Sequence, residues 1–426
     1  MLNAADWTIR LNELATEANV PGAALGIWSD AQEILAAHGV LNAVTQVPVT
    51  TDSVFQVGSI TKLWTATMIM QLVDEGLLSL DTTVSEVLPG ARLGTADIGD
   101  QVTVRHLLTH TSGIDGDVFT DTGRGDDCVE RYVGLLAEVP SVFTPGATYS
   151  YCNSGYVLLG RIIEVIDGQS WDESLRERLT GPLAATQTVT LPEEAILRRA
   201  AVGHQRCGTP VQVWGLPRSI GPAGLITTTP GDLLTFARLH LDGGITADGK
   251  RLLSEAAVTA MRSACAAIPE FSAPGSAIGL GWRLSRWGNR TIVGHDGDTI
   301  GQSAYLRIDP EAGIAACLLT NSAESGDLVP GGVQRGVRGP DRRDHAPAAA
   351  SRGRGSRVRL RSRGGRPACP DARGGRPGAV RRPLRAYVPA VRRLGARRQA
   401  RNGADHDGKP GGPGRRRTRG PAAVSG

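Results

Sequence analysis

The sequence predicts an α+β fold in which an antiparallel sheet is flanked by helices and joined to a mainly helical subdomain. Strand patterns occur near both ends of the first 330 residues, and helical periodicity dominates residues 53 to about 180 between them. Because both ends supply strands, they are expected to meet in one sheet, with a functional site at the seam between the sheet and the helical insert. The expected strands are residues 22–30, 32–41, 280–285, 291–295, 302–308 and 314–320.

The charge of the chain changes sign near residue 330. Residues 1–330 contain 21 basic and 37 acidic residues, a net charge of −16, and are expected to form the folded domain. Residues 331–426 contain 25 Arg, 1 Lys and 5 Asp, a net charge of +21. Two interpretations of this tail stay open. It is a disordered Arg/Gly/Pro-rich arm that would bind nucleic acid or an acidic surface, or the frameshifted product of a GC-rich gene.

Composition argues against several classes of protein. The six cysteines are scattered without a Cys-x-x-Cys pair, so we expect no zinc site and no disulfide framework. No metal-ligand cluster is visible in the sequence, and no cofactor is expected. No run of about 18 apolar residues occurs, so no transmembrane helix is expected. Residues 1–19 form an acid-containing amphipathic pattern without the regions of a signal peptide. A cytoplasmic monomer is expected, or a membrane-associated protein of the cell envelope if the N-terminus is misassigned.

A serine and a lysine three residues apart open a helical pattern that runs to about Glu75. Residues i and i+3 share one face of a helix, so Lys62 is expected beside Ser59. A serine hydroxyl needs a neighbour that takes its proton, and a lysine does so when burial or nearby positive charge lowers its pKa. The alternative is an ordinary surface pair. Against it, the chain has only three lysines and otherwise uses arginine, which cannot lose its proton.

A second motif contains a tyrosine and an asparagine, residue types that often act in catalytic loops. Tyr151 and Asn153 follow a turn and are expected in a loop before a helix at about 156–166. The Tyr151 phenol would relay a proton, and the Asn153 amide would bind a substrate carbonyl and accept from Lys62. The alternative is a packed tyrosine and a helix-capping asparagine.

His295 and Gly297 end a predicted strand at 291–295. His295 would place a titratable cation near the site, and Gly297 would let the substrate backbone lie against the strand edge. The alternative is a histidine in an ordinary turn.

In this order the motifs resemble those of the serine β-lactamase and penicillin-binding protein family. The similarity is to the branch of class C β-lactamases, low-molecular-mass DD-carboxypeptidases, D-aminopeptidases and β-lactamase-like esterases. It covers roughly residues 5 to 325 and implies the β-lactamase/transpeptidase-like fold. Supporting segments are Phe55 to Lys62, Leu107 to Gly113, Gly221 to Leu225 and Gly279 to Trp282.

The resemblance implies a role for each matched residue. Ser59 would be the nucleophile, Lys62 its base partner, Tyr151 the proton relay and Asn153 the ligand of the substrate amide. His295 and Gly297 would stand where the family has Lys or His and Gly, the N–H groups of Ser59 and Asp298 would form the oxyanion hole, and His110 would be structural.

The chain departs from the β-lactamase pattern in its third motif. His295 replaces the usual lysine, and Asp296 and Asp298 flank Gly297, where they would repel a substrate carboxylate unless an arginine such as Arg283 compensates. The favoured function is a penicillin-binding DD-carboxypeptidase of the cell wall that β-lactams acylate. The alternatives are a β-lactamase-like esterase or amidase, a class C-type β-lactamase, and a penicillin sensor that does not turn over. Nucleic acid is a partner only if the basic tail is authentic.

Overall fold

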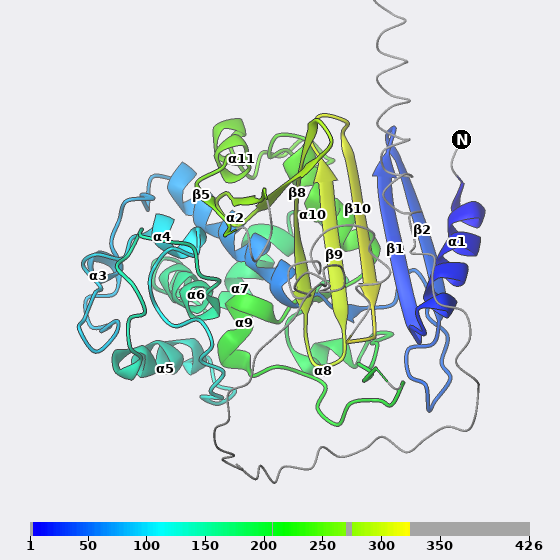
Figure 1. The fold of residues 1–426 in the computed structure, drawn as a ribbon, viewed down its shortest axis with the longest axis horizontal. Coiled ribbons are helices and arrows are strands. Elements are labelled where there is room, and N and C mark those ends of the chain that lie inside the picture. The colour runs from blue at the N-terminus through cyan, green and yellow to red at the C-terminus, as the bar shows by residue number, and fades with distance from the viewer. Residues whose placement is uncertain (1–2, 207, 270–274, 324–426) are drawn as a thin grey trace, which may run out of the picture.

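Strands from both ends of the domain meet in one antiparallel sheet (Figure 1). The computed structural model describes residues 3–206, 208–269 and 275–323. In the eight-stranded sheet the order is β2-β1-β10-β9-β8-β7-β6-β5, and Leu25 of β1 lies opposite Leu318 of β10. The strands are β1 (Gly22–Ser29), β2 (Gln32–Gly39), β5 (Ala266–Ala267), β6 (Ala277–Ile278), β7 (Arg283–Trp287), β8 (Arg290–Asp298), β9 (Ser303–Asp309) and β10 (Ile314–Thr320), and β3 (Phe55–Gln56) pairs separately with β4 (Thr227–Thr228).

Most helices lie between β3 and β4 in the sequence and form the region beside the sheet (Figure 1). The α-helices are α1 (Ala4–Glu17), α2 (Thr61–Asp74), α3 (Val84–Val87), α4 (Val104–Leu108), α5 (Cys128–Leu135), α6 (Asn153–Asp167), α7 (Trp171–Leu175), α8 (Pro192–Ala195), α9 (Gly221–Gly224), α10 (Pro230–Leu241) and α11 (Glu255–Met261). The 3₁₀ turns are η1 (Gly58–Ile60), η2 (Leu136–Glu138) and η4 (Arg218–Ile220), and η3 (Arg176–Thr180) is a π-turn.

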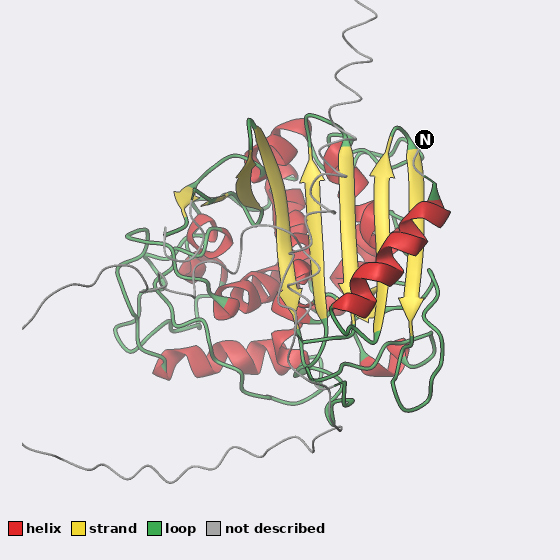
Figure 2. Ribbon diagram, turned by 45° about the vertical axis from the view of Figure 1, so that its right-hand side comes forward, coloured by secondary structure: helices red, strands yellow, loops and turns green. Residues whose placement is uncertain are grey.

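The sheet separates two hydrophobic cores. Helix α1 lies across one face (Figure 2), where Trp7 and Leu11 pack on alternate residues of β1, β2 and β10. On the other face β1 and β10 meet α10, and this core continues around α2 and α6. Strands covered on both sides are buried on both faces, which explains the continuous apolar run of β10. Helix α2 is buried on nearly all sides because α6, α9, α7 and the turns η1 and η3 surround it.

The predicted fold class is confirmed, and the boundaries differ in a few places. Strand β8 extends to Asp298, three residues beyond its predicted end, so the whole third motif belongs to the sheet. The helix expected at 156–166 begins at Asn153, so Asn153 does not lie in a loop. The basic tail lies outside the described residues.

Candidate active site

Ser59 lies in a 3₁₀ turn whose backbone touches the end of β8. At Gly297, a Cβ atom would stand 1.9 Å from the Val57 carbonyl oxygen and 2.8 Å from the Ser59 nitrogen. Gly58 has φ of 49°, and a Cβ there would stand 2.6 Å from the Asp298 carbonyl oxygen. Because neither position has a side chain, the two backbones meet directly. The amide groups of Ser59 and Asp298 are thereby brought together at this backbone contact between Gly58 and Gly297, which we call the glycine seam.

Lys62 is enclosed beside Ser59, as the three-residue spacing predicted. Its Nζ donates to Ser59 Oγ at 3.1 Å and to the Ala223 carbonyl at 2.7 Å, and its side chain is 0% exposed. Burial lowers the pKa of Lys62 to about 7, because the ammonium form loses its hydration. Near neutral pH an appreciable fraction of the amine is therefore free to accept the serine proton.

Tyr151 covers the other side of the lysine. The Lys62 Nζ lies 5.0 Å from the centroid of the Tyr151 ring. Burial raises the pKa of the Tyr151 phenol, and nearby Ser59 opposes this only in part, so the hydroxyl keeps its proton. Among the described residues no hydrogen bond of ordinary geometry reaches this hydroxyl. It is therefore a protonated donor directed at the nucleophile region, not a phenolate.

Asn153 occupies a different position from the one predicted. It is the first residue of α6, and its N–H donates to the Gly116 carbonyl at 3.2 Å. The cap of this helix is Cys152, whose sulfur accepts from the Gly155 N–H at 3.2 Å. The expected hydrogen bond from Lys62 to Asn153 does not occur in the described part of the chain, where the lysine donates to Ser59 and to the Ala223 carbonyl.

His295 lies on β8 beside these groups, but it is neutral rather than cationic. Its Nδ1 contacts the Asp296 carbonyl at 2.5 Å, and the ring is 2% exposed. Burial, with the positive charges of Arg283 and Lys62, lowers the pKa of His295 well below its usual value. The predicted cation is thus a neutral imidazole, and Arg283 provides the positive charge near it.

The acidic residues around Gly297 have their own partners. Asp296 forms an ion pair of 2.6 Å with Arg307 on β9, and Asp298 accepts a hydrogen bond of 2.7 Å from Ser303. Arg307, rather than Arg283, therefore compensates Asp296. The sequence offered a signal for this pair only once the strand register was known, because Arg307 lies diagonally across the β8–β9 ladder from Asp296. Arg283 has no carboxylate partner among the residues that the structure describes.

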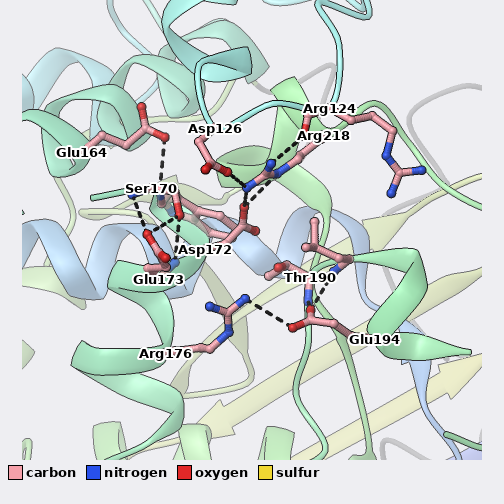
Figure 3. Close-up of polar contacts among 12 residues, drawn as sticks. Arg124, Asp126, Glu164, Ser170, Asp172, Glu173, Arg176, Thr190, Glu194 and Arg218 are labelled. Atoms are coloured by element: carbon pink, nitrogen blue, oxygen red, sulfur yellow. Dashed lines mark hydrogen bonds and ion pairs between the residues drawn. The ribbon is translucent and has the colours of Figure 1, made fainter. Parts of the chain in front are cut away.

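The carbonyl that holds Lys62 is carried by a segment anchored through Arg218 (Figure 3). Arg218 pairs with Asp172 at 2.9 Å and Asp126 at 2.8 Å, and it donates to the Arg124 carbonyl at 2.6 Å. These bonds tie α7 and the loop before α5 to η4, which directly precedes α9 and its residue Ala223. In the sequence this segment, Gly221 to Leu225, resembles the family, but the sequence gives no sign of the role of the Ala223 carbonyl.

Within residues 3–206, 208–269 and 275–323, no group of three or more His, Cys, Asp or Glu side chains is placed to hold a metal ion. Over the same ranges, no helix is long and apolar enough to cross a membrane.

Comparison with known proteins agrees with this geometry. The family model described as Beta-lactamase matches residues 10–334. Penicillin-binding protein 4 of Amycolatopsis lactamdurans is 49% identical over 323 residues, which cover 74% of this chain and 85% of that protein.

More distant relatives include a peptidase and an amidohydrolase. The D-alanyl-D-alanine-carboxypeptidase/endopeptidase AmpH of Escherichia coli K12 is 26% identical, covering 69% of this chain and 78% of that protein. The solved structure of a D-stereospecific amidohydrolase from Streptomyces sp. is 28% identical with a TM-score of 0.61, covering 77% of this chain and 97% of that one. Together with the Ser59–Lys62 pair, these matches show that the chain belongs to the β-lactamase family of serine hydrolases and penicillin-binding proteins.

Proposed function

We propose that the protein is a penicillin-binding DD-carboxypeptidase that acts through an acyl-enzyme on Ser59. It cleaves the amide bond before a C-terminal D-alanine, and β-lactams acylate the same serine. The observation that carries the proposal is the hydrogen bond between Ser59 and a fully buried Lys62 whose pKa is about 7. The 49% identity to a protein named as penicillin-binding supports the choice of substrate class.

In acylation, the neutral Lys62 amine takes the proton of Ser59 as Oγ attacks the substrate carbonyl carbon. The resulting oxyanion is stabilised by the N–H groups of Ser59 and Asp298 at the glycine seam. Proton transfer through Tyr151 to the leaving nitrogen lets the C–N bond break, and Lys62 restores the phenol. The products are a Ser59 ester and a free amine.

In deacylation a water molecule replaces the amine. It loses a proton to the same Lys62–Tyr151 pair, attacks the ester carbonyl, and releases the carboxylic acid while Ser59 regains its proton. With a small leaving group such as D-alanine the path for water is open after the first step. With a β-lactam the leaving group stays attached, which slows water and favours a stable adduct.

Substrate orientation is assigned to Arg283, His295 and Asn153. Arg283 lies opposite Gly294 in the β7–β8 register and would meet the terminal carboxylate of the substrate. The His295 Nε2 is buried and has no hydrogen-bond partner among the described residues, so it is available to a bound ligand. Asn153 would hold the amide on the opposite side of the substrate.

Intact-protein mass spectrometry tests the proposal. Wild type and Ser59→Ala are incubated with benzylpenicillin and, separately, with a peptide ending in D-Ala-D-Ala. We expect one benzylpenicillin adduct on the wild type alone and release of D-alanine from the peptide. A stable adduct without peptide cleavage would favour a penicillin sensor, and hydrolysed penicillin without an adduct would favour a β-lactamase.

One observation favours an esterase or amidase as a second candidate. The His295 imidazole is neutral, and the Asp298 carboxyl lies at the end of β8. Arg283 on the neighbouring strand β7 is then the positive charge near His295, and it has no carboxylate partner among the described residues. Substrates without a carboxylate would suit such a site. Faster cleavage of D-alanine amide than of the D-Ala-D-Ala peptide, lost in Ser59→Ala, would support this candidate.

A further inference from the structure

His110 holds both sides of the residue that carries the phenol. The His110 carbonyl accepts the Ser150 N–H at 2.9 Å, and its ring Nδ1 accepts the Cys152 N–H at 3.0 Å. The ring also packs on Tyr151 with centroids 4.5 Å apart. The residues before and after Tyr151 are therefore both hydrogen-bonded to His110, one to its backbone carbonyl and the other to its ring.

The backbone of His110 is unusual for a residue with a side chain. It follows helix α4 with φ of 57°, the position after a helix where glycine is preferred. The Thr111 N–H returns to the His106 carbonyl at 2.9 Å, as in a left-handed helix end. A residue with a side chain in this strained conformation points to a requirement for that side chain. A glycine would adopt this turn with less conformational strain, so the turn alone does not explain why a histidine is present.

The hydrogen bond fixes the protonation state of the ring. A nitrogen that accepts the Cys152 N–H must carry a lone pair, so the imidazole is neutral with its proton on Nε2. Burial and the positive charges of Lys62, His295 and Arg283 lower the pKa of His110 well below its usual value. The ring is 1% exposed, and the phenols of Tyr149, Tyr151 and Tyr156 surround it. No acidic side chain is among the causes that shift it.

We propose that His110 is a positioning residue for proton transfer, which sets the location of the Tyr151 hydroxyl by binding the peptide groups on both sides of that residue. This inference rests on the proposed role of Tyr151 in acylating Ser59. It assigns His110 an effect on the rate of acylation rather than on substrate affinity, because no part of His110 faces solvent or substrate.

Two substitutions separate this role from that of a turn former. His110→Asn tolerates a positive φ and offers Oδ1 where the histidine has Nδ1. His110→Gly favours the backbone conformation even more but removes the acceptor and the ring. Acylation of Ser59 is followed with benzylpenicillin and with D-alanine p-nitroanilide, and thermal unfolding is measured for each variant.

We expect His110→Gly to lower the acylation rate about 10- to 100-fold with little change in KM, a part of the usual effect of a proton-transfer group. His110→Asn is expected to recover the rate to within about threefold of wild type, given that it keeps the acceptor. A glycine variant as fast as wild type, or glycine and asparagine variants that are equally slow while folded, would overturn the inference.

A double-mutant cycle provides an independent measurement. If His110 acts through Tyr151, then His110→Gly should have no further effect on the rate in a Tyr151→Phe background, whereas independent sites give additive effects. Additivity would overturn the inference. If Ser59→Ala removes activity and Tyr151→Phe lowers it, the proposed function stands whatever His110 does. Activity that survives in Ser59→Ala, or its absence in wild type, would overturn both.

Discussion

At the scale of single residues, the chemistry depends on one amine kept out of water. Lys62 has a carbonyl acceptor, a serine and two tyrosine rings around it, and none of these is a carboxylate. An ion pair would stabilise the ammonium and raise its pKa, whereas a neutral enclosure lowers it. The environment of Lys62 thus makes it a base near pH 7.

The first prediction concerns the pH dependence of acylation. Since Lys62 must be deprotonated to accept the serine proton, kcat/KM should rise with pH through about 7 and then level off. Lys62→Met should remove this rise and lower the rate by about 10²- to 10⁴-fold, the usual contribution of a general base. Stopped-flow acylation by benzylpenicillin between pH 5 and 9 measures both. A wild-type profile that is flat across neutrality would contradict the assignment.

The second prediction concerns stability. Between pH 7 and the ordinary pKa of 10.5, the unfolded chain binds a proton at Lys62 that the folded protein does not, so the free energy of unfolding should increase with pH. Lys62→Met should remove this slope. At pH 7 it should also stabilise the fold by about 2 kcal/mol, because the cost of neutralising a buried lysine exceeds the loss of its hydrogen bonds. Denaturant titrations of both proteins at pH 7 and pH 9 test it, and a variant less stable than wild type at both would refute it.

The third prediction concerns Arg283. Its replacement by Gln should raise KM for a D-Ala-D-Ala peptide about 10-fold or more, since a hydrogen bond between charged groups is lost. The kinetics for D-alanine amide, which has no carboxylate, should stay within about twofold, because no charged contact is lost there. Arg286→Gln is the matched control, an exposed arginine of the same strand. Equal losses on both substrates would argue against carboxylate binding.

Local contacts within the site could be predicted from the sequence better than the charge states of its residues. The spacing of Ser59 and Lys62 predicted their contact correctly, because it depends on local helix geometry alone. The charge of His295 could not be predicted, since it depends on burial and on Arg283 from another strand. The partner of Lys62 was missed for the same reason: Ala223 is distant in sequence and contributes only its backbone.

At the scale of elements, the site depends on how closely β8 approaches the turn before α2. The contact consists of two peptide backbones, and each glycine in it has no room for a methyl group. Strand β8 therefore both pairs with β7 and β9 inside the sheet and sets the position of the amides around Ser59.

The fourth prediction tests this approach. Gly297→Ala should push β8 away from the turn, destabilising the protein by about 1–3 kcal/mol and slowing acylation more than 10²-fold as the oxyanion contacts separate. Gly134→Ala is the control. Gly134 lies in α5 with no atom near its missing Cβ, and this change should stabilise by about 0.5–1 kcal/mol. Thermal unfolding and adduct formation are measured together. A Gly297→Ala variant with wild-type stability and acylation rate would show that the glycine seam can accommodate a methyl group.

The boundaries of elements were less predictable than their existence. Helix α6 begins three residues before its predicted start because a cysteine sulfur, not a serine or asparagine oxygen, caps it. Strand β8 continues through His295 and Gly297 because β9 pairs with it as far as Asp298. The pairing of β8 with β9 is not local to the segment, and cysteine is not among the residues that commonly cap helices, so propensity alone could not have found either boundary.

At the scale of the whole molecule, the sheet has one face toward the candidate active site and an opposite face that is covered by α1. The core under α1 contains no residue of the active site, whereas the core around α2 contains Phe55, Tyr156 and other neighbours of it. The meeting of early and late strands was predicted, because strand patterns occur on both sides of the helical region in the sequence. The sheet order was not, because it depends on long-range pairing.

The fifth prediction follows from this division. Trp7→Ala removes a buried indole (5% exposed) from the core under α1 and should lower stability by about 3–5 kcal/mol. In the protein that remains folded at 25 °C, the acylation rate of Ser59 should match wild type, because the sheet separates the two cores. Calorimetry and stopped-flow kinetics on one sample are sufficient. A folded variant with slowed acylation would show that the two faces are coupled.

The glycine seam also limits how such an enzyme can acquire new substrates. A contact between two backbones contains no side chain that could be exchanged. Substitution of Gly58 or Gly297 would therefore only separate the two backbones and lower activity. New specificity must come from the surrounding loops, such as the one before α5, where Phe119 is 55% exposed. A library built for directed evolution should therefore hold the seam constant and randomise those loops, and natural divergence of substrate range should follow the same division.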